Sequence, residues 1–360
     1  MPIDNENVPS LDWPTESVEP APTPFAPDQM VRCDDCLRAN PPTRVNCMYC
    51  GAILPQSDSN AALRQPTLRR LEKWERGYNN ILLPTGANLD EPALAEAADL
   101  LRLTPENLSS ILSAGKVLPL ARASSLAEAS LVQDRLLKFG ITSAIMSEAE
   151  NDSEAGGPVR VRSMEINHAG IEAYQTRETA PISFSWCDVI LLVAGRIIIK
   201  RVELKEQKAK RAENSILDAN EFVTDELVID LYLQGDSPPL RVASNNFDFS
   251  CLGAGKGLMA ADNITRLVQL IRVKAPQAEY DDSFNSVRKL LDLVWPPEQQ
   301  NESSGWRRER PGKITLGSAT ELNNQNQFTR YSQLRRMIKA SAVPRPERDS
   351  LVLEGNDGVA

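Results

Sequence analysis

The stretch CDDCLRANPPTRVNCMYC, residues 33–50, holds four cysteines as two CxxC pairs with ten residues between them. Cys33 and Cys36 form the first pair, and Cys47 and Cys50 form the second. Two CxxC turns supply the four thiolates of a tetrahedral Zn²⁺ site, which leaves no coordination position for water or a substrate. Two disulfides or a chance spacing are the alternatives, and a reducing compartment disfavours the disulfides. The pattern therefore predicts a structural zinc site with these four ligands.

This stretch resembles zinc fingers of the Ran-binding-protein type. Cys36, Asn40 and Cys47 match the spacing of the cysteine and asparagine skeleton of that family. The second pair continues as CxxCG, with Gly51, which is equally similar to the wider zinc-ribbon class. The resemblance implies a small zinc-ribbon module of about 25 residues, with the zinc ion in a structural role.

The module departs from that family at the positions through which its members bind their targets. Val31 stands where the family has a tryptophan, and Leu37 and Arg38 replace the Thr-Phe pair of the ubiquitin-binding members. Ubiquitin binding is therefore not expected. Arg38, Arg44 and Asn46 match features of the RNA-binding members, but the stacking tryptophan is missing, and stacking contributes about 1–3 kcal/mol per base.

The composition is that of a folded, acidic protein. The 360 residues are 41% hydrophobic and 25% charged, which allows two or three domains with cores of their own. The net charge of −9 argues against strong non-specific binding to nucleic acid or anionic membranes. His168 is the one histidine and lies in a predicted turn. Because no nucleophile, base and orienting group can be placed together, we expect a protein that is not an enzyme.

The sequence contains no pattern typical of export or membrane insertion. The first basic residue is Arg32, and no apolar run precedes it. The most apolar stretch, Val189 to Ile199, is interrupted by Gly195 and Arg196 and is shorter than the roughly 20 residues that span a bilayer. Together with the paired CxxC turns, these features predict a cytoplasmic protein.

Shifts in composition predict an α+β multidomain chain with linkers and disordered ends. The expected folded parts are a zinc-ribbon module (31–55), a small α/β domain (67–150) and a β-rich, barrel-like domain with two closing helices (159–298). The expected connecting and terminal parts are an acidic, proline-rich arm (1–30), linkers (56–66 and 151–158) and a mostly disordered tail (299–360).

Residues 117–147 have the pattern of a strand, a helix and a second strand. Apolar side chains recur at helical spacing after Ser125, an expected N-cap, and Gly140 ends the helix. The pattern predicts half of a ferredoxin-like sandwich. The segment also resembles a prokaryotic signal-transducing domain, which implies a regulatory role. The residues that carry this resemblance are Ser125, Glu128, Ala129, Gly140 and Ile141.

Residues 158–295 are similar in layout to pleckstrin-homology-like barrels, with several strands followed by helices. Two closing helices are predicted where that family has one. Phosphoinositide binding would need a basic loop, but the lysines and arginines of residues 200–211 alternate with acidic residues. We interpret this segment as a solvated charged face.

Three further features of the sequence are candidate sites. LGAGKGL (252–258) departs from a phosphate-binding loop because Ser250 stands at the first glycine position and Gly257 follows Lys256. We interpret it as a turn between a strand and a helix. Cys187 and Cys251 lie among apolar residues, so we expect both to be buried and unreactive.

These features together predict a non-catalytic, zinc-binding adaptor or regulatory protein that acts through protein–protein interaction. The alternative is a protein that binds single-stranded RNA or DNA through the zinc module and a basic tail, which the net charge disfavours. A third hypothesis is an enzyme with an unrecognised site in the β-rich domain. The basic tail residues are Arg307, Arg308, Arg310, Arg335 and Arg336.

Overall fold

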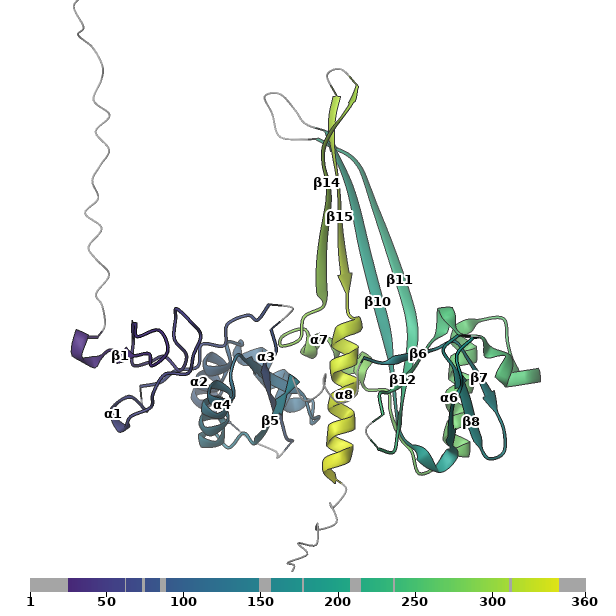
Figure 1. Ribbon diagram of the computed structural model, residues 1–360, viewed down its shortest axis with the longest axis horizontal. Coiled ribbons are helices and arrows are strands. Elements are labelled where there is room, and N and C mark those ends of the chain that lie inside the picture. The colour runs from purple at the N-terminus through teal and green to yellow at the C-terminus, as the bar shows by residue number, and fades with distance from the viewer. Residues whose placement is uncertain are drawn as a thin grey trace, which may run out of the picture. The chain divides into compact units, whose positions relative to one another are not determined.

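The computed structural model describes residues 25–61, 63–72, 75–84, 89–148, 157–176, 178–207, 215–235, 237–310 and 313–342. The chain divides into two units, Met1–Thr67 and Leu68–Ala360 (Figure 1). Most of the expected acidic arm, residues 1–24, lies outside the described residues. The end of the arm forms a short 3₁₀ turn, Pro27–Gln29.

The first unit is organised around its cysteines. Strands β1 (Val31–Arg32) and β2 (Ala39–Asn40) form one short antiparallel pair. The buried cluster of this unit consists of Cys33, Cys47 and Leu54. So small a cluster buries little apolar area, which is the situation in which a bound metal supplies the folding free energy.

The expected linker at 56–66 belongs to this unit. It contains the one-turn helix α1 (Asp58–Ala61). The buried Arg64 side chain donates hydrogen bonds to the carbonyl oxygens of Leu54 (2.7 Å) and Pro55 (2.8 Å). The prediction of a linker was therefore wrong for this segment, because a polar sequence can be held by backbone carbonyls as well as by an apolar core.

The second unit begins with an α/β part. Its sheet has the strand order β4-β3-β5, and both outer strands are antiparallel to β3. Helix α4 joins β4 to β5, so the predicted strand–helix–strand is present with β3 inserted between its strands. The elements are β3 (Tyr78–Leu82), α2 (Glu91–Leu101), α3 (Pro105–Ser113), β4 (Pro119–Ala123), α4 (Leu126–Lys138) and β5 (Ser143–Ser147).

Strand β3 is a finding that periodicity does not predict. It carries Asn79 and Asn80, both fully buried, at the centre of the sheet. Asn79 accepts a hydrogen bond from the indole of Trp295 (2.8 Å), and Asn80 donates one to the carbonyl of Ala129 (2.9 Å). Buried amides are stable only with such partners, and those partners lie far away in the sequence.

The β-rich part contains an open sheet of seven strands in the order β14-β15-β10-β11-β12-β6, with β13 paired to β10. Within the described residues these strands do not close into the expected barrel, since β14 and β6 stand at opposite ends. The strands are β6 (Val159–Val161), β10 (Val189–Gln207), β11 (Ser215–Leu233), β12 (Leu240–Ala243), β13 (Glu279–Asp281), β14 (Glu298–Arg310) and β15 (Lys313–Asn323).

A second, smaller sheet and three helices complete the β-rich part. The small sheet consists of β7 (Ser163–Ile166), β8 (Gly170–Tyr174) and β9 (Ile182–Ser185). The 3₁₀ turns are Trp186–Asp188, Ser244–Asn246 and Phe249–Gly255. The helices are α6 (Ala260–Lys274), α7 (Phe284–Leu291) and α8 (Gln325–Ala342). Helices α6 and α7 are the two predicted closing helices.

The α/β part and the β-rich part share one hydrophobic core, in contrast to the two independent domains expected from the sequence. Ile81 and Leu120 belong to the same buried cluster as Leu191, Phe284 and Trp295. The expected linker at 151–158 therefore does not separate two cores; its residues 151–156 lie outside the described ranges. The composition of a linker does not show whether the elements on either side pack together.

The expected disordered tail is folded over most of its length. Residues 298–310 and 313–323 pair as the antiparallel strands β14 and β15, and α8 follows. Phe328, Tyr331 and Leu334 of α8 are buried in the shared core, and the Phe328 ring lies 5.1 Å from the ring of Phe284. Polar and basic residues surround these apolar positions and obscure the pattern. Residues 343–360 lie outside the described part of the chain.

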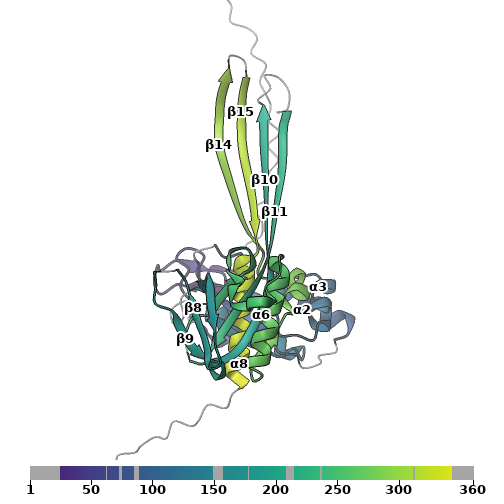
Figure 2. The same ribbon diagram turned by 90° about the vertical axis from the view of Figure 1, so that its right-hand side faces the viewer.

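Two long hairpins extend from the body of this unit as a four-stranded arm (Figures 1 and 2). We define the arm as residues 199–207, 215–226, 298–310 and 313–323. The core ends at Ile197 on β10 and Val228 on β11. Beyond these residues β10 pairs with β15 and β11, and no described helix covers the sheet (Figure 2).

Candidate metal centre

The two cysteine pairs of the first unit adopt the same backbone turn. In the first pair, Leu37 N donates to Cys33 O (2.9 Å), and in the second, Gly51 N donates to Cys47 O (3.0 Å). Leu37 and Gly51 both have left-handed backbones, with φ of 60° and 80°. Glycine adopts this conformation readily, whereas a leucine there is uncommon. The repeated turn points both thiols of each pair to one place.

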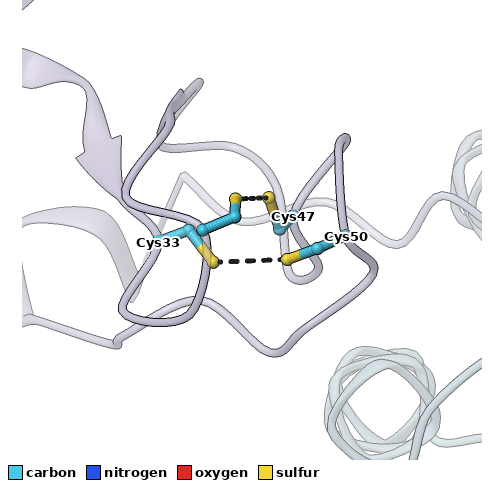
Figure 3. A group of neighbouring side chains, drawn as sticks. Cys33, Cys47 and Cys50 are labelled. Carbon is cyan, nitrogen blue, oxygen red and sulfur yellow. Dashed lines mark hydrogen bonds between the residues drawn. The ribbon is translucent and has the colours of Figure 1, made fainter.

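The four sulfur atoms form a compact cluster (Figure 3). All of them lie within 4.8 Å of one another. The Cys33 and Cys50 sulfurs are 3.6 Å apart, and the Cys36 and Cys47 sulfurs are 3.5 Å apart. A tetrahedral zinc with Zn–S bonds of about 2.3 Å separates its sulfurs by about 3.8 Å, whereas a disulfide needs about 2.05 Å. The spacing fits ligands of one metal ion and not disulfides.

Asn40 holds the second cysteine pair in position. It is fully buried, and its side chain donates to the Cys47 sulfur (3.4 Å) and accepts a hydrogen bond from Met48 N (2.9 Å). Tyr49 N also donates to the Cys47 sulfur (3.4 Å). Such outer contacts orient metal ligands and stabilise their charge. These hydrogen bonds explain why an asparagine at position 40 accompanies the cysteines in the predicted skeleton.

The electrostatics of the cluster favour a bound cation. Burial acts to raise the pKa of Cys47, but the backbone N–H groups of Cys50 and Tyr49 and the Asn40 side chain lower it to about 6. The Ala52 N–H acts to lower the pKa of Cys50. Burial and the hydrogen bonds with the other three cysteines outweigh this effect and raise that pKa to about 12. Four thiolates repel one another when no cation is present. A divalent ion removes that repulsion, so the donor set fits such an ion.

Large apolar side chains surround the cluster and face solvent. Leu37, Met48, Tyr49 and Ile53 each expose between 54% and 58% of their surface. The Arg38 guanidinium lies 4.7 Å from the centre of the Tyr49 ring. The family's tryptophan position, Val31, does not reveal this exposed aromatic residue. Tyr49 lies instead between the two cysteines of the second pair.

Among the residues that the structure describes, Cys187, Cys251 and His168 belong to no cluster that could hold a metal ion. Cys187 is exposed, so the prediction that it is buried was wrong; it lies in the 3₁₀ turn that follows β9 and not within a strand. Cys251 is half-buried, and burial raises the pKa of its thiol to about 11. His168 is exposed in the turn between β7 and β8, as predicted.

The segment LGAGKGL spans the end of a 3₁₀ turn and the approach to α6, in agreement with its interpretation as a turn. Gly253 takes a left-handed φ of 54° there. The Lys256 ammonium group lies 3.2 Å from the Asp248 carboxylate. Its charge is therefore already paired within the turn.

The predicted basic tail is not one free segment. Arg335 pairs with Glu279 (2.7 Å), and Arg336 donates to the carbonyl of Leu233 (2.7 Å), so both stabilise the packing of α8. Arg307 lies on β14 of the arm. Arg308 and Arg310 belong to the same strand, and their side chains lie outside the description.

Comparisons with protein-family models, curated proteins and solved structures find no match to this chain. Within the described part of the chain, no helix is long and apolar enough to cross a membrane. The cluster of Cys33, Cys36, Cys47 and Cys50 is consistent with a zinc-ribbon-like, metal-binding module.

Proposed function

We propose that this chain is a non-catalytic, cytoplasmic adaptor or regulatory protein that holds a structural Zn²⁺ and acts through protein–protein contacts. Four thiolates saturate a tetrahedral zinc, so such an ion binds no substrate and activates no water. The role of the metal is then to shape the surface of the first unit. That surface, rather than the ion, carries the function.

The observation that supports this proposal is the set of apolar side chains exposed around the cysteines. Leu37, Met48 and Tyr49 lie on the two metal-binding turns, and Ile53 follows them. Exposed apolar residues that cluster on one small module are typical of interaction sites. Methionine and tyrosine are also enriched in protein interfaces. The metal-binding turns present these residues in a fixed arrangement.

The arm offers a second surface for a protein partner. Its strand β11 exposes Ile216, Leu217, Phe222 and Val223, and β15 exposes Leu322. Over residues 215–226, β11 has no strand on its outer side within the described chain. An open strand edge can pair with a strand of another protein. Two separate surfaces are what an adaptor requires.

The test is a double substitution of Met48→Ser and Tyr49→Ser, with Leu63→Ser as the matched control. Leu63 is exposed in the same unit and does not lie on a metal-binding turn. Proteins captured from a native lysate by cross-linking should be lost with the double variant and kept with the control, while zinc content stays at one per chain. Capture of the same proteins by all three chains would contradict the proposal.

Binding of single-stranded nucleic acid is a second candidate, favoured by Tyr49 with Arg38 beside it. Stacking of one base on this ring contributes about 1–3 kcal/mol, so Tyr49→Ala should weaken binding of a labelled oligonucleotide about 5- to 150-fold. Fluorescence anisotropy at physiological salt measures this effect. Absence of binding by the zinc-loaded chain would eliminate this candidate and leave the adaptor proposal standing.

A further inference from the structure

Arginines gather in two adjoining cavities of the second unit, although the whole chain has a net charge of −9. The cavities have volumes of about 440 and 290 Å³ and share Asn326 and Arg330 in their walls. Eight arginines line them, against two carboxylates, Glu298 and Glu148. We call this space the arginine pocket. Such a local reversal of charge favours an anionic ligand.

Part of this positive charge is compensated inside the protein. Arg241 makes a buried double hydrogen bond with Asp230 (2.7 Å for each contact), and Arg122 makes one with Glu148 (2.8 and 2.6 Å). Arg69 pairs with Glu75. These three ion pairs explain the presence of Arg241, Arg122 and Arg69, but they do not explain the other arginines of the pocket.

Four guanidinium groups of the pocket donate no hydrogen bond to any residue that the structure describes. They are Arg70, Arg102, Arg160 and Arg330. Arg70, Arg102 and Arg160 are exposed at the rim, where water can serve them. Arg330 differs, because only 23% of its side chain is exposed.

Arg330 lies where the two cavities meet. Its nearest partner is Glu148, at 3.8 Å, which is too long for a hydrogen bond. The Glu148 carboxylate already accepts bonds from Arg122 and from Gly77 N (3.0 Å). A guanidinium has five N–H donors in a planar fork. Those of Arg330 have no acceptor within hydrogen-bond distance in the described protein and face the two cavities, and a ligand with several anionic oxygens supplies such acceptors.

The walls of the larger cavity also include apolar side chains, among them Leu71, Leu103, Leu293 and Pro297. Its volume lies in the range of small-molecule sites, which combine apolar walls with a few polar anchors. Planar guanidinium groups bind phosphate oxygens in pairs. The arginine pocket therefore has the chemistry of a phosphate site with room for an organic group.

We propose that the arginine pocket binds a small, multiply charged phosphate anion, with Arg330 as its central contact and Arg160 at its rim. The site lies wholly in the second unit and does not depend on the metal centre. An organic phosphate and inorganic polyphosphate share this chemistry, and the experiment distinguishes them.

The experiment titrates the full, zinc-loaded chain with inorganic pyrophosphate and, separately, with ADP, using calorimetry and thermal unfolding. Arg330→Gln should weaken binding at least about tenfold, since a charge-assisted contact exceeds 1.4 kcal/mol. Arg160→Gln, on the exposed rim, should weaken it less and tests the site even if the first variant does not fold. Tighter binding of ADP identifies an organic phosphate, and equal binding identifies the inorganic anion.

Arg162→Gln is the matched control. Arg162 is exposed two residues after Arg160, carries the same charge and does not line either cavity. It should bind both probes like the unaltered chain. The proposal is overturned if neither probe binds, or if Arg162→Gln weakens binding as much as Arg160→Gln. It is also overturned in a competition assay if single-stranded RNA displaces ADP from an Arg330-dependent site at a lower concentration than pyrophosphate needs.

Discussion

Replacement of Glu148 by glutamine tests how the α/β part is joined to the C-terminal helix. Glu148 follows β5 and is buried. Its carboxylate accepts hydrogen bonds from both arms of the Arg122 guanidinium (2.8 and 2.6 Å), from Gly77 N (3.0 Å) and from Asn79 (3.2 Å). Arg330 of α8 adds a positive charge at 3.8 Å. A glutamine amide keeps the shape but removes the charge.

The lowered pKa of Glu148 gives the size of the expected loss of unfolding free energy. Burial acts to raise this pKa, but the hydrogen bonds from Arg122 and the charge of Arg330 outweigh burial and lower the pKa from 4.5 to about 2. This difference corresponds to about 3 kcal/mol of unfolding free energy at neutral pH. Because the folded-state pKa is the lower one, the stabilisation is complete above pH 4.5 and is lost as the pH falls toward 2. At pH 3, less than half should remain.

Urea unfolding of both chains at pH 7 and pH 3, followed by circular dichroism, measures this effect. Glu148→Gln should be about 3 kcal/mol less stable than the unaltered chain at pH 7, and the gap should shrink by more than half at pH 3. Glu96→Gln, a surface change on α2, is the control and should be neutral at both values. A gap below about 1 kcal/mol at pH 7, or one that does not depend on pH, would refute the reasoning.

Native mass spectrometry should find one zinc per chain. The zinc should be lost in the Cys33→Ser, Cys36→Ser double variant and kept in Cys187→Ser, which changes an exposed cysteine outside the cluster. Zinc retained by the double variant would contradict the assignment. A strong chelator should collapse the NMR signals of residues 33–50 but leave the main unfolding transition in place, because the second unit has its own cores; a large fall in that transition would contradict this independence. Gly195→Ala should cost about 1–3 kcal/mol, since the new Cβ would lie 2.5 Å from the Phe328 ring, whereas Gly255→Ala meets nothing within 4 Å; equal effects would show that α8 does not pack there.

Features that depend on near neighbours in the chain were predicted correctly. The two CxxC pairs come together because each pair is one turn long, and Asn40 lies close enough to reach them. Ser125, the expected N-cap, caps α4 by accepting a hydrogen bond from Glu128 N (3.2 Å). Each of these contacts spans few residues, so composition and spacing contain the information.

Features that join distant parts of the chain were decided by the tertiary structure. The burial of Asn79 depends on Trp295, 216 positions away, which donates a hydrogen bond to its side chain. Helix α8 reads as part of a tail until Phe328 meets Phe284. Arg330 becomes a site residue only where α8 meets Glu148. The sequence by itself determined the clustering of the four cysteines and the local helices. The core shared by the two parts of the second unit, its arm and its arginine pocket depend on long-range burial. A polar group is stable inside a protein only when a partner satisfies it, and here that partner is distant in the sequence.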